Sequence, residues 1–195
     1  LTIAGFISLT LLGETEAHKL WYHKRLCNIF KLLTKLMPSV ACDIQNVANE
    51  TFEKPGVIIA NHQSHLDLMY LLMLNPRIIC LTNTWVWHCP FYGQIIRYAD
   101  FYPVENGIET NVEKLKTAID RGYSILVFPE GTRSEDCDIL RFHQGAFFLA
   151  DKLNADIIPI MIHGIGHLFP KKEFLFRKGK ATIKIFDRIR PDDQN

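Results

Sequence analysis

Apolar and polar positions divide most of the chain into short strands and intervening helices. Runs rich in Ile and Val predict buried strands over residues 57–60, 78–81, 124–128, 156–162 and 181–186, and a first strand with its turn is expected over 42–52. Apolar residues at helical spacing predict helices over 14–36, 68–74, 109–121 and 146–153. This alternation indicates an α/β fold, with a single domain, a largely parallel or mixed central sheet flanked by helices, and ligand loops at the carboxyl ends of the strands.

One of these strands contains a proline. Pro159 lies inside the run 156–162, and a proline cannot donate a hydrogen bond to a neighbouring strand. We therefore expect this strand to lie at an edge of the sheet or to contain a bulge.

The N-terminal residues have a different pattern. The apolar run Leu1 to Leu12 is shorter than the roughly 20 residues that span a bilayer, and is either the stump of a longer segment or a buried helix. Residues 14–36, which end before Pro38, predict a basic amphipathic helix with aromatic side chains. This composition favours contact with an anionic membrane over packing as an ordinary surface helix. We expect a membrane-associated helical segment at 1–40, followed by a domain at 41–195 that belongs to a larger polypeptide.

Composition narrows the function classes. A hydrophobic content of 48% suffices for a sizeable core, and the net charge of +1 gives no reason to expect nucleic acid as a partner. The five cysteines are an odd number without a Cys-x-x-Cys pair, which argues against a disulfide framework or a zinc site. Reduced, cytoplasmic thiols fit best.

The candidate chemistry lies where the strand predicted over 57–60 ends. His62 follows that strand, and Ser64 with Asp67 three residues later resembles a capping box that opens a helix. The helix dipole and the unpaired amides of the first turn favour an ionised Asp67. A carboxylate beside an imidazole can hold one ring nitrogen protonated and leave the other free to take a proton from a bound hydroxyl. The alternative is that Ser64 and Asp67 only cap the helix and that His62 satisfies a backbone carbonyl.

Three blocks carry a resemblance to a known family. Asn61 to Asp67 (NHQSHLD) resembles the His-x4-Asp block of the glycerolipid acyltransferases, which include lysophosphatidic acid and glycerol-3-phosphate acyltransferases. Phe128 to Ser134 (FPEGTRS) resembles their second diagnostic block, and Ile157 to Ile160 resembles the last. The likeness covers about residues 50–187, and the second block at the end of an apolar strand is its most specific part.

The resemblance implies a reaction. An acyl group would move from acyl-CoA or acyl-ACP to the hydroxyl of a lysophospholipid or a related lyso-lipid, with His62 as general base oriented by Asp67. The acyl donor would be a co-substrate, and no cofactor and no metal are expected. Gly-x-Ser-x-Gly and Gly-x4-Gly-Lys-Ser/Thr are absent from the chain, in keeping with a reaction that needs neither a serine nucleophile nor ATP.

The second block also implies substrate-binding residues, which are Glu130, Gly131, Thr132 and Arg133, with Arg141 further on. Arg133 is the strongest candidate for a phosphate contact, because a guanidinium can donate two parallel hydrogen bonds. Gly131 would let backbone approach the ligand closely. Glu130 would either accept from the acceptor hydroxyl or fix Arg133, and the sequence does not separate these roles.

One position departs from the family pattern. Many relatives carry an arginine, assigned to the acceptor phosphate, where this chain has Val104. Either the acceptor is another lyso-lipid, or Arg133 and Arg141 bind the phosphate alone. Lys171 and Lys172 lie on a late loop, where donor phosphates and solvent are equally reasonable contacts.

Other functions compete with acyl transfer from a thioester. His62, His65 and Asp67 are residue types of a metal-dependent hydrolase, although His65 is expected to point elsewhere. A non-catalytic lipid-binding domain and a transacylase that uses phospholipid as donor are further alternatives. Aromatic residues at 85, 87, 91 and 92 would either bind the acyl chain or only pack. The expected partners are the lyso-lipid, the acyl donor and the membrane surface, at the cytoplasmic face of the inner membrane.

Overall fold

The computed structural model describes residues 15–37, 39–90, 93–104, 107–171, 173 and 175–193. Within these ranges the strands are β1 (Val40–Asn46), β2 (Val57–Ala60), β3 (Ile78–Thr82), β4 (Tyr102–Pro103), β5 (Ser124–Val127), β6 (Ile157–His163) and β7 (Gly179–Ile185). The helices are α2 (Glu16–Lys35), α3 (Leu66–Leu72), α4 (Thr84–His88), α5 (Gly93–Tyr98), α6 (Val112–Asp120), α7 (Gly145–Leu153) and α8 (Ile165–Leu168), with a 3₁₀ turn η1 (Ile108–Asn111) before α6.

The described strands form one mixed sheet in the order β1-β7-β6-β2-β5-β3-β4. All neighbouring pairs are parallel except β6 and β7, which are antiparallel. The predicted α/β class with a mixed central sheet is therefore confirmed. Because β2 lies between β5 and β6 and is parallel to both, the carboxyl ends of all three strands lie on the same side, and the loops that follow them meet there.

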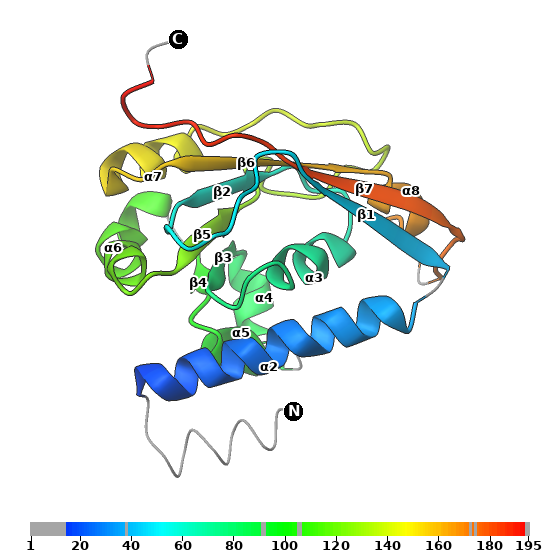
Figure 1. Ribbon diagram of the computed structural model, residues 1–195, viewed down its shortest axis with the longest axis horizontal. Helices are drawn as coiled ribbons and strands as arrows, with labels where there is room; N and C mark the ends of the chain where they lie inside the picture. Colours follow the sequence, from blue (N-terminus) through cyan, green and yellow to red (C-terminus); the bar gives the residue numbers. More distant parts are fainter. Residues whose placement is uncertain are drawn as a thin grey trace.

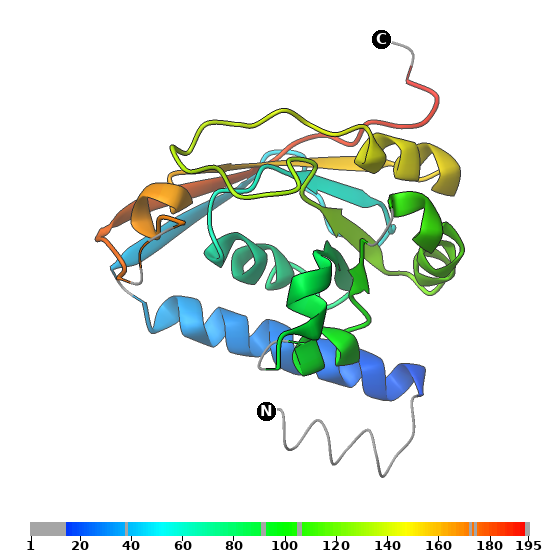
Figure 2. The ribbon, with the colours of Figure 1, turned by 180° about the vertical axis from the view of Figure 1, so that it is seen from behind.

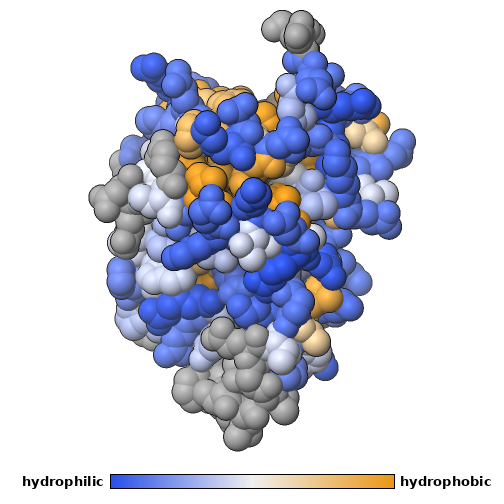
Figure 3. All heavy atoms as spheres, turned by 90° about the vertical axis from the view of Figure 1, so that its left-hand side faces the viewer, coloured by the Kyte–Doolittle hydropathy of each residue, from blue (hydrophilic) through white to orange (hydrophobic). Residues whose placement is uncertain are grey.

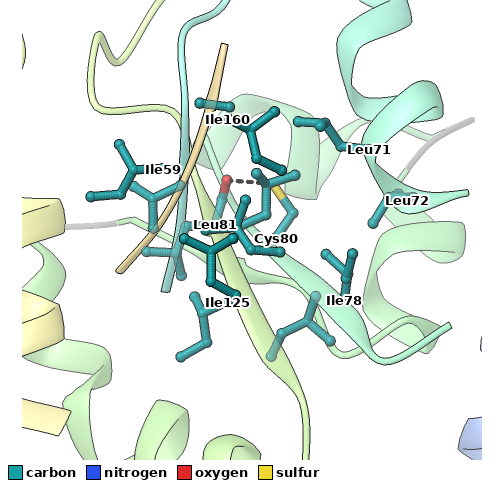
Figure 4. Close-up of a cluster of buried hydrophobic side chains, with 14 of the residues drawn as sticks. Ile59, Leu71, Leu72, Ile78, Cys80, Leu81, Ile125 and Ile160 are labelled. Carbon is teal, nitrogen blue, oxygen red and sulfur yellow. Dashed lines mark hydrogen bonds between the residues drawn. The ribbon is translucent and has the colours of Figure 1, made fainter. Parts of the chain in front are cut away.

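The core fills both sides of the sheet. Cys80 and Ile160 point to the side on which Leu71 and Leu72 of α3 lie, and Ile59 and Ile125 point to the other side (Figure 4). Each buried aliphatic side chain contributes roughly 1.5–3 kcal/mol relative to an exposed one. In two opposite views α3 lies between the sheet and the long helix α2 (Figures 1 and 2). Helix α3, which begins four residues after His62, is thus held by the core.

Helix α2 packs on the domain along one face and is exposed along another. Tyr22, His23, Leu26 and Cys27 are buried, and Lys19 forms an ion pair of 2.8 Å with Asp100. The exposed large apolar side chains of this segment are Trp21, Leu32, Leu33 and Leu36. Among the described helices, none is both long enough and apolar enough to cross a bilayer. The predictions for Leu1 to Leu12 and Pro38 lie outside the described residues.

The strand that contains Pro159 fits one of its two predicted alternatives. This strand, β6, lies between β7 and β2, so it is not an edge strand. Ile157 and Ile160 are three steps apart, whereas their partners Ile189 and Ile185 are four steps apart, so the opposing segment carries one extra residue. Such an offset is the mark of a bulge, and it lies beside the proline that cannot donate.

Several short elements were not predicted. α4, α5, β4 and α8 are each at most six residues long, too short for a periodic pattern to identify them. Of the aromatic residues predicted to form a rim, Trp85 is exposed on α4 and Trp87 is half-buried. Phe91 and Tyr92 lie outside the described residues.

An ion-pair cluster lies at the amino ends of β2 and β6. Arg188 contacts both Glu50 oxygens at 2.6 and 2.8 Å, and its Nη1 lies 3.3 Å from Asp156. Lys54 Nζ lies 2.7 Å from the same Asp156 oxygen. A cavity of about 270 Å³ opens beside these side chains. The face at this end of the sheet carries mostly hydrophilic side chains around a smaller hydrophobic group (Figure 3).

Candidate active site

The Asn61 side chain, just after β2, forms hydrogen bonds to β6 like those of a strand backbone. Asn61 is buried, its Nδ2 donates to the Ile162 carbonyl at 2.8 Å, and its Oδ1 accepts from the Ile162 amide at 2.7 Å. These two bonds continue the β2–β6 pairing by one position after the β2 backbone turns away. The position of the next residue, His62, is therefore fixed by β6 as well as by its own strand.

Asp67 holds together the turn between β2 and α3, residues 61–67, which we call the corner. Its side chain has no exposed area, and its Oδ2 accepts from the backbone amides of Gln63 at 2.6 Å and Ser64 at 2.8 Å. The same oxygen lies 2.9 Å from His62 Nδ1. An ionised carboxylate only accepts, so Nδ1 carries the proton and Nε2 is the ring nitrogen that can take one.

The predicted capping box forms only in part. Asp67 reaches back to the Ser64 amide as such a box requires, but the Ser64 hydroxyl donates to the Phe169 carbonyl at 2.8 Å. The Asp67 amide bonds to the Ser64 carbonyl instead, and α3 begins at Leu66 with His65 in the capping position. The serine therefore joins the corner to the segment after α8, a long-range contact that competes with the local one.

The His62 ring is held on its face as well as at its edge. It stacks on the Phe128 ring with 4.0 Å between centroids and 18° between planes, and 20% of the side chain is exposed. Phe128 follows β5, so the second block supports the ring that the first block carries. An imidazole held at Nδ1 and along its face keeps Nε2 in one direction, which a general base requires.

Glu130 fastens the loop after β5 to this corner. The side chain is buried, Oε1 accepts from the His62 amide at 2.6 Å, and Oε2 accepts from the Leu140 amide at 2.7 Å. The Ser134 amide in turn donates to the His62 carbonyl at 3.0 Å. Both Glu130 oxygens are thus engaged by backbone amides rather than by Arg133.

The residues after Glu130 form the exposed part of the second block. Gly131 has φ +67°, and an added Cβ would lie no closer than 3.7 Å to His143, so the left-handed backbone rather than crowding favours glycine. Thr132 is exposed. Arg133 is half-buried, and its Nη1 is a buried atom without a hydrogen-bond partner in the described part of the chain.

Arg133 lies within electrostatic reach of the His62–Asp67 pair. Burial lowers the pKa of Arg133, and the Asp67 charge opposes that shift. Burial also lowers the pKa of His65, with a further contribution from the Arg133 charge. The charges of the first and second blocks therefore interact, and the Arg133 cation opposes the charge of the buried carboxylate.

Other predicted residues lie apart from these contacts. Arg141 is exposed on the same loop, two residues before His143, whose amide donates to the Pro129 carbonyl at 2.8 Å. Val104 is half-buried just after β4, where its amide donates to the Thr82 carbonyl. Lys172 lies outside the described residues. Within the described ranges no group of three or more His, Cys, Asp or Glu side chains is arranged to hold a metal ion.

Two contacts of the corner have no signal in the sequence. Gln63 is buried, donates to the Cys137 carbonyl at 2.8 Å and receives a longer contact of 3.5 Å from the Gly166 amide. Lys171 contacts the loop that carries Thr132 and Arg133. Both join segments that are remote in the sequence, and only the polarity of the side chains could have drawn attention to them.

Comparison with known proteins places the chain beside known acyltransferases. The family model described as Acyltransferase matches residues 39–163. A 1-acyl-sn-glycerol-3-phosphate acyltransferase of Chlamydomonas reinhardtii is 32% identical over 146 residues, covering 72% of this chain and 44% of the relative. A chloroplastic protein of the same name from Brassica napus is 31% identical over 160 residues, covering 79% of this chain and 46% of the relative.

A solved structure resembles the whole chain. The crystal structure of the 1-acyl-sn-glycerophosphate acyltransferase of Thermotoga maritima has a TM-score of 0.78 and 24% identity, and the match covers 100% of this chain and 86% of that one. This similarity supports the fold. The chain spans somewhat less than half the length of the Chlamydomonas and Brassica relatives. Because the family model covers both the His62–Asp67 corner and the loop from Glu130 to Arg133, the chain belongs to the acyltransferase family.

Proposed function

We propose that this chain is an O-acyltransferase that moves a fatty acyl group from acyl-CoA or acyl-ACP to the hydroxyl of a lysophospholipid or a related lyso-lipid. The observation that carries the proposal is the 2.9 Å contact between His62 Nδ1 and Asp67 Oδ2 at the carboxyl end of β2. Membership of the acyltransferase family and the names of the relatives support the same reaction class.

In the proposed mechanism His62 Nε2 takes the proton from the acceptor hydroxyl as the hydroxyl oxygen attacks the thioester carbonyl. The C–S bond then breaks, and the imidazolium gives this proton to the departing thiolate. Asp67 holds Nδ1–H throughout and stabilises the positive charge on the ring, as in a triad whose nucleophile is supplied by the substrate. General-base catalysis of this kind contributes about 10²–10⁴ in rate.

Arg133 is proposed to bind an acceptor anion. Its buried Nη1 has no hydrogen-bond partner in the described part of the chain, and a buried donor without a partner costs roughly 1–3 kcal/mol. A phosphate oxygen would satisfy it with a charge-assisted bond. Arg133→Ala should raise KM for lysophosphatidic acid by about tenfold with a smaller effect on kcat. An unchanged KM would remove this assignment.

The proposal includes association with the membrane at its cytoplasmic face. Trp21, Leu32, Leu33 and Leu36 are exposed on or beside α2, and Lys31 and Lys35 are exposed among them. Apolar side chains interleaved with lysines suit an anionic lipid surface. Vesicles that contain phosphatidylglycerol should sediment the protein, and Leu32→Ser with Leu36→Ser should weaken this. Equal sedimentation of the double variant would contradict a role for this surface.

The reaction is tested with purified protein, oleoyl-CoA or oleoyl-ACP, and a panel of lyso-lipid acceptors. We expect thiol release that depends on the acceptor and matches the amount of acylated product measured by mass spectrometry. Release without acylated product would indicate a hydrolase instead. Product formed from phospholipid without a thioester would indicate a transacylase, and vesicle binding without turnover would indicate a lipid-binding domain.

A further inference from the structure

Lys171 approaches the catalytic corner from a distant part of the chain. It lies after α8 in the chain. In both views the loop after β5 extends toward the end of the molecule that carries α8 (Figures 1 and 2). The bond of 2.8 Å from the Ser64 hydroxyl to the Phe169 carbonyl fixes the backbone two residues before it. Lys171 is therefore held beside the first block by a contact other than its own side chain.

The ammonium group meets neutral oxygens at close range. Lys171 Nζ donates to the Arg133 carbonyl at 3.0 Å and to Thr132 Oγ1 at 3.3 Å. It also forms an ion pair of 3.9 Å with Glu135 Oε1, on a side chain that is 58% exposed. The two closest partners carry no charge and an exposed ion pair contributes little, so an anion beside Arg133 can still bind the ammonium group.

Thr132 and Lys171 together form a pair of donors. Because Thr132 Oγ1 accepts from the lysine, the hydroxyl hydrogen can donate outward. The Lys171 side chain is 27% exposed, so its remaining N–H can reach a ligand without the full cost of desolvation. With the unpartnered Arg133 Nη1, two adjacent residues of one loop and the lysine that contacts them offer three donors, a set of groups suited to a tetrahedral oxyanion.

We infer that Lys171 is a second cation, beside Arg133, that binds a phosphate group of a substrate. The inference rests on the proposed function. It also explains how this chain can bind phosphate with Val104 at the position where many relatives carry an arginine, because the second charge comes from another segment. The phosphate belongs either to the acyl acceptor or to the acyl donor, whose carriers both contain phosphate.

The test compares KM values for the two substrates. Lys171→Met should raise KM for lysophosphatidic acid, for oleoyl-CoA, or for both by about tenfold, with kcat changed by no more than about twofold. A rise confined to the first substrate assigns the phosphate to the acceptor, and a rise confined to the second assigns it to the donor. Lys178→Met, an exposed lysine of the same loop, is the matched control and should leave both values unchanged.

Two further variants separate binding from a structural tether. Lys171→Arg keeps the charge and should restore most of the affinity, whereas Lys171→Gln keeps a donor without the charge and should not. Unchanged KM values for both substrates in Lys171→Met would overturn the inference. A fall in kcat alone would also overturn it, because that pattern indicates that the lysine only holds the loop.

A binding measurement makes the inference independent of turnover. Lysophosphatidic acid, presented below its aggregation concentration, and coenzyme A are titrated calorimetrically into His62→Ala protein with and without Lys171→Met. Weaker binding of either ligand in the double variant supports the inference even if the wild-type protein transfers no acyl group, which would defeat only the proposed function. If the two proteins bind each ligand with the same affinity, the phosphate site itself is contradicted.

Discussion

The two ends of β2 carry buried carboxylates in opposite circumstances. At the amino end, Arg188 and Lys54 engage Glu50 and Asp156 in a closed set of ion pairs. At the carboxyl end, Asp67 is fully buried but its Oδ1 has no hydrogen-bond partner in the described part of the chain. Arg133 Nη1 lies unpartnered near the same corner.

This difference separates a structural cluster from a reactive one. Buried polar atoms without partners cost roughly 1–3 kcal/mol each, so a fold optimised only for stability would satisfy them. The amino-end cluster does so, and its charges have little left to offer a ligand. The corner keeps unsatisfied groups beside a histidine that is only partly exposed, which is the arrangement expected of a site that acts on something else.

The largest predicted effect is on turnover at the corner. Asp67→Asn keeps an oxygen for the Gln63 and Ser64 amides but removes the charge that stabilises the His62 imidazolium, so kcat should fall by about 10²–10⁴ with the fold retained. Initial rates of acyl transfer measure this. Asp151→Asn, an exposed aspartate on α7, is the control. A variant with the wild-type rate would show that the carboxylate is only a helix cap.

Breaking an ion pair at the amino end of β2 should change stability and leave turnover unchanged. Arg188→Met leaves Glu50 without its guanidinium partner, and breaking a largely buried pair from one side costs about 3 kcal/mol. Urea unfolding should show this loss, while kcat for folded protein stays at the wild-type value. Arg190→Met, an exposed neighbour, should leave stability unchanged. A large fall in kcat with normal stability would reverse the roles assigned to the two ends.

Glu130→Gln distinguishes a positioning role from substrate contact. A glutamine can accept from the His62 amide or the Leu140 amide, but its amide group repels the other N–H. We expect kcat to fall by about tenfold with little change in KM for the acceptor. Glu113→Gln, exposed on α6, serves as the control. A raised acceptor KM with an unchanged kcat would support direct contact between Glu130 and the substrate.

The smallest predicted effect is the loss of the Arg188–Glu50 contribution to stability at low pH. Hydrogen bonding to Arg188 lowers the pKa of Glu50 from its ordinary value of 4.5. A depressed carboxyl pKa adds stability above the unfolded value, and that stability is lost as the pH falls through the folded value. The difference in unfolding free energy between wild type and Arg188→Met should therefore shrink as the pH falls below the ordinary carboxyl pKa of 4.5. A difference that stays constant as the pH falls would show that the pair contributes through packing.

Much of the fold could be predicted because its signals are local. The runs at 57–60, 78–81 and 124–128 are continuous apolar segments, and each forms a strand within a residue of its predicted bounds. The strand-to-helix corner also follows from adjacent residues. The bulge beside Pro159 was one of two predicted alternatives, but the interior place of β6 could not be predicted, because it depends on which segments pair with that strand.

The contacts of the candidate site also divide into those that the sequence predicts and those that it does not. The proximity of His62 to Asp67 follows from their spacing at a helix start, and the second block was identified by its resemblance to a family. The engagement of Glu130 by the His62 and Leu140 amides depends on two loops that meet only in the folded chain. The approach of Lys171 to Arg133 is likewise a product of the sheet order, which the sequence pattern does not encode.

The most direct measurement is acyl transfer by His62→Ala beside His167→Ala, an exposed histidine on α8. If the imidazole held by Asp67 removes the acceptor proton, His62→Ala should lose at least about 10²-fold in rate with an unfolding free energy within about 1 kcal/mol of wild type. His167→Ala should keep the wild-type rate. Wild-type turnover by purified His62→Ala protein would contradict the account.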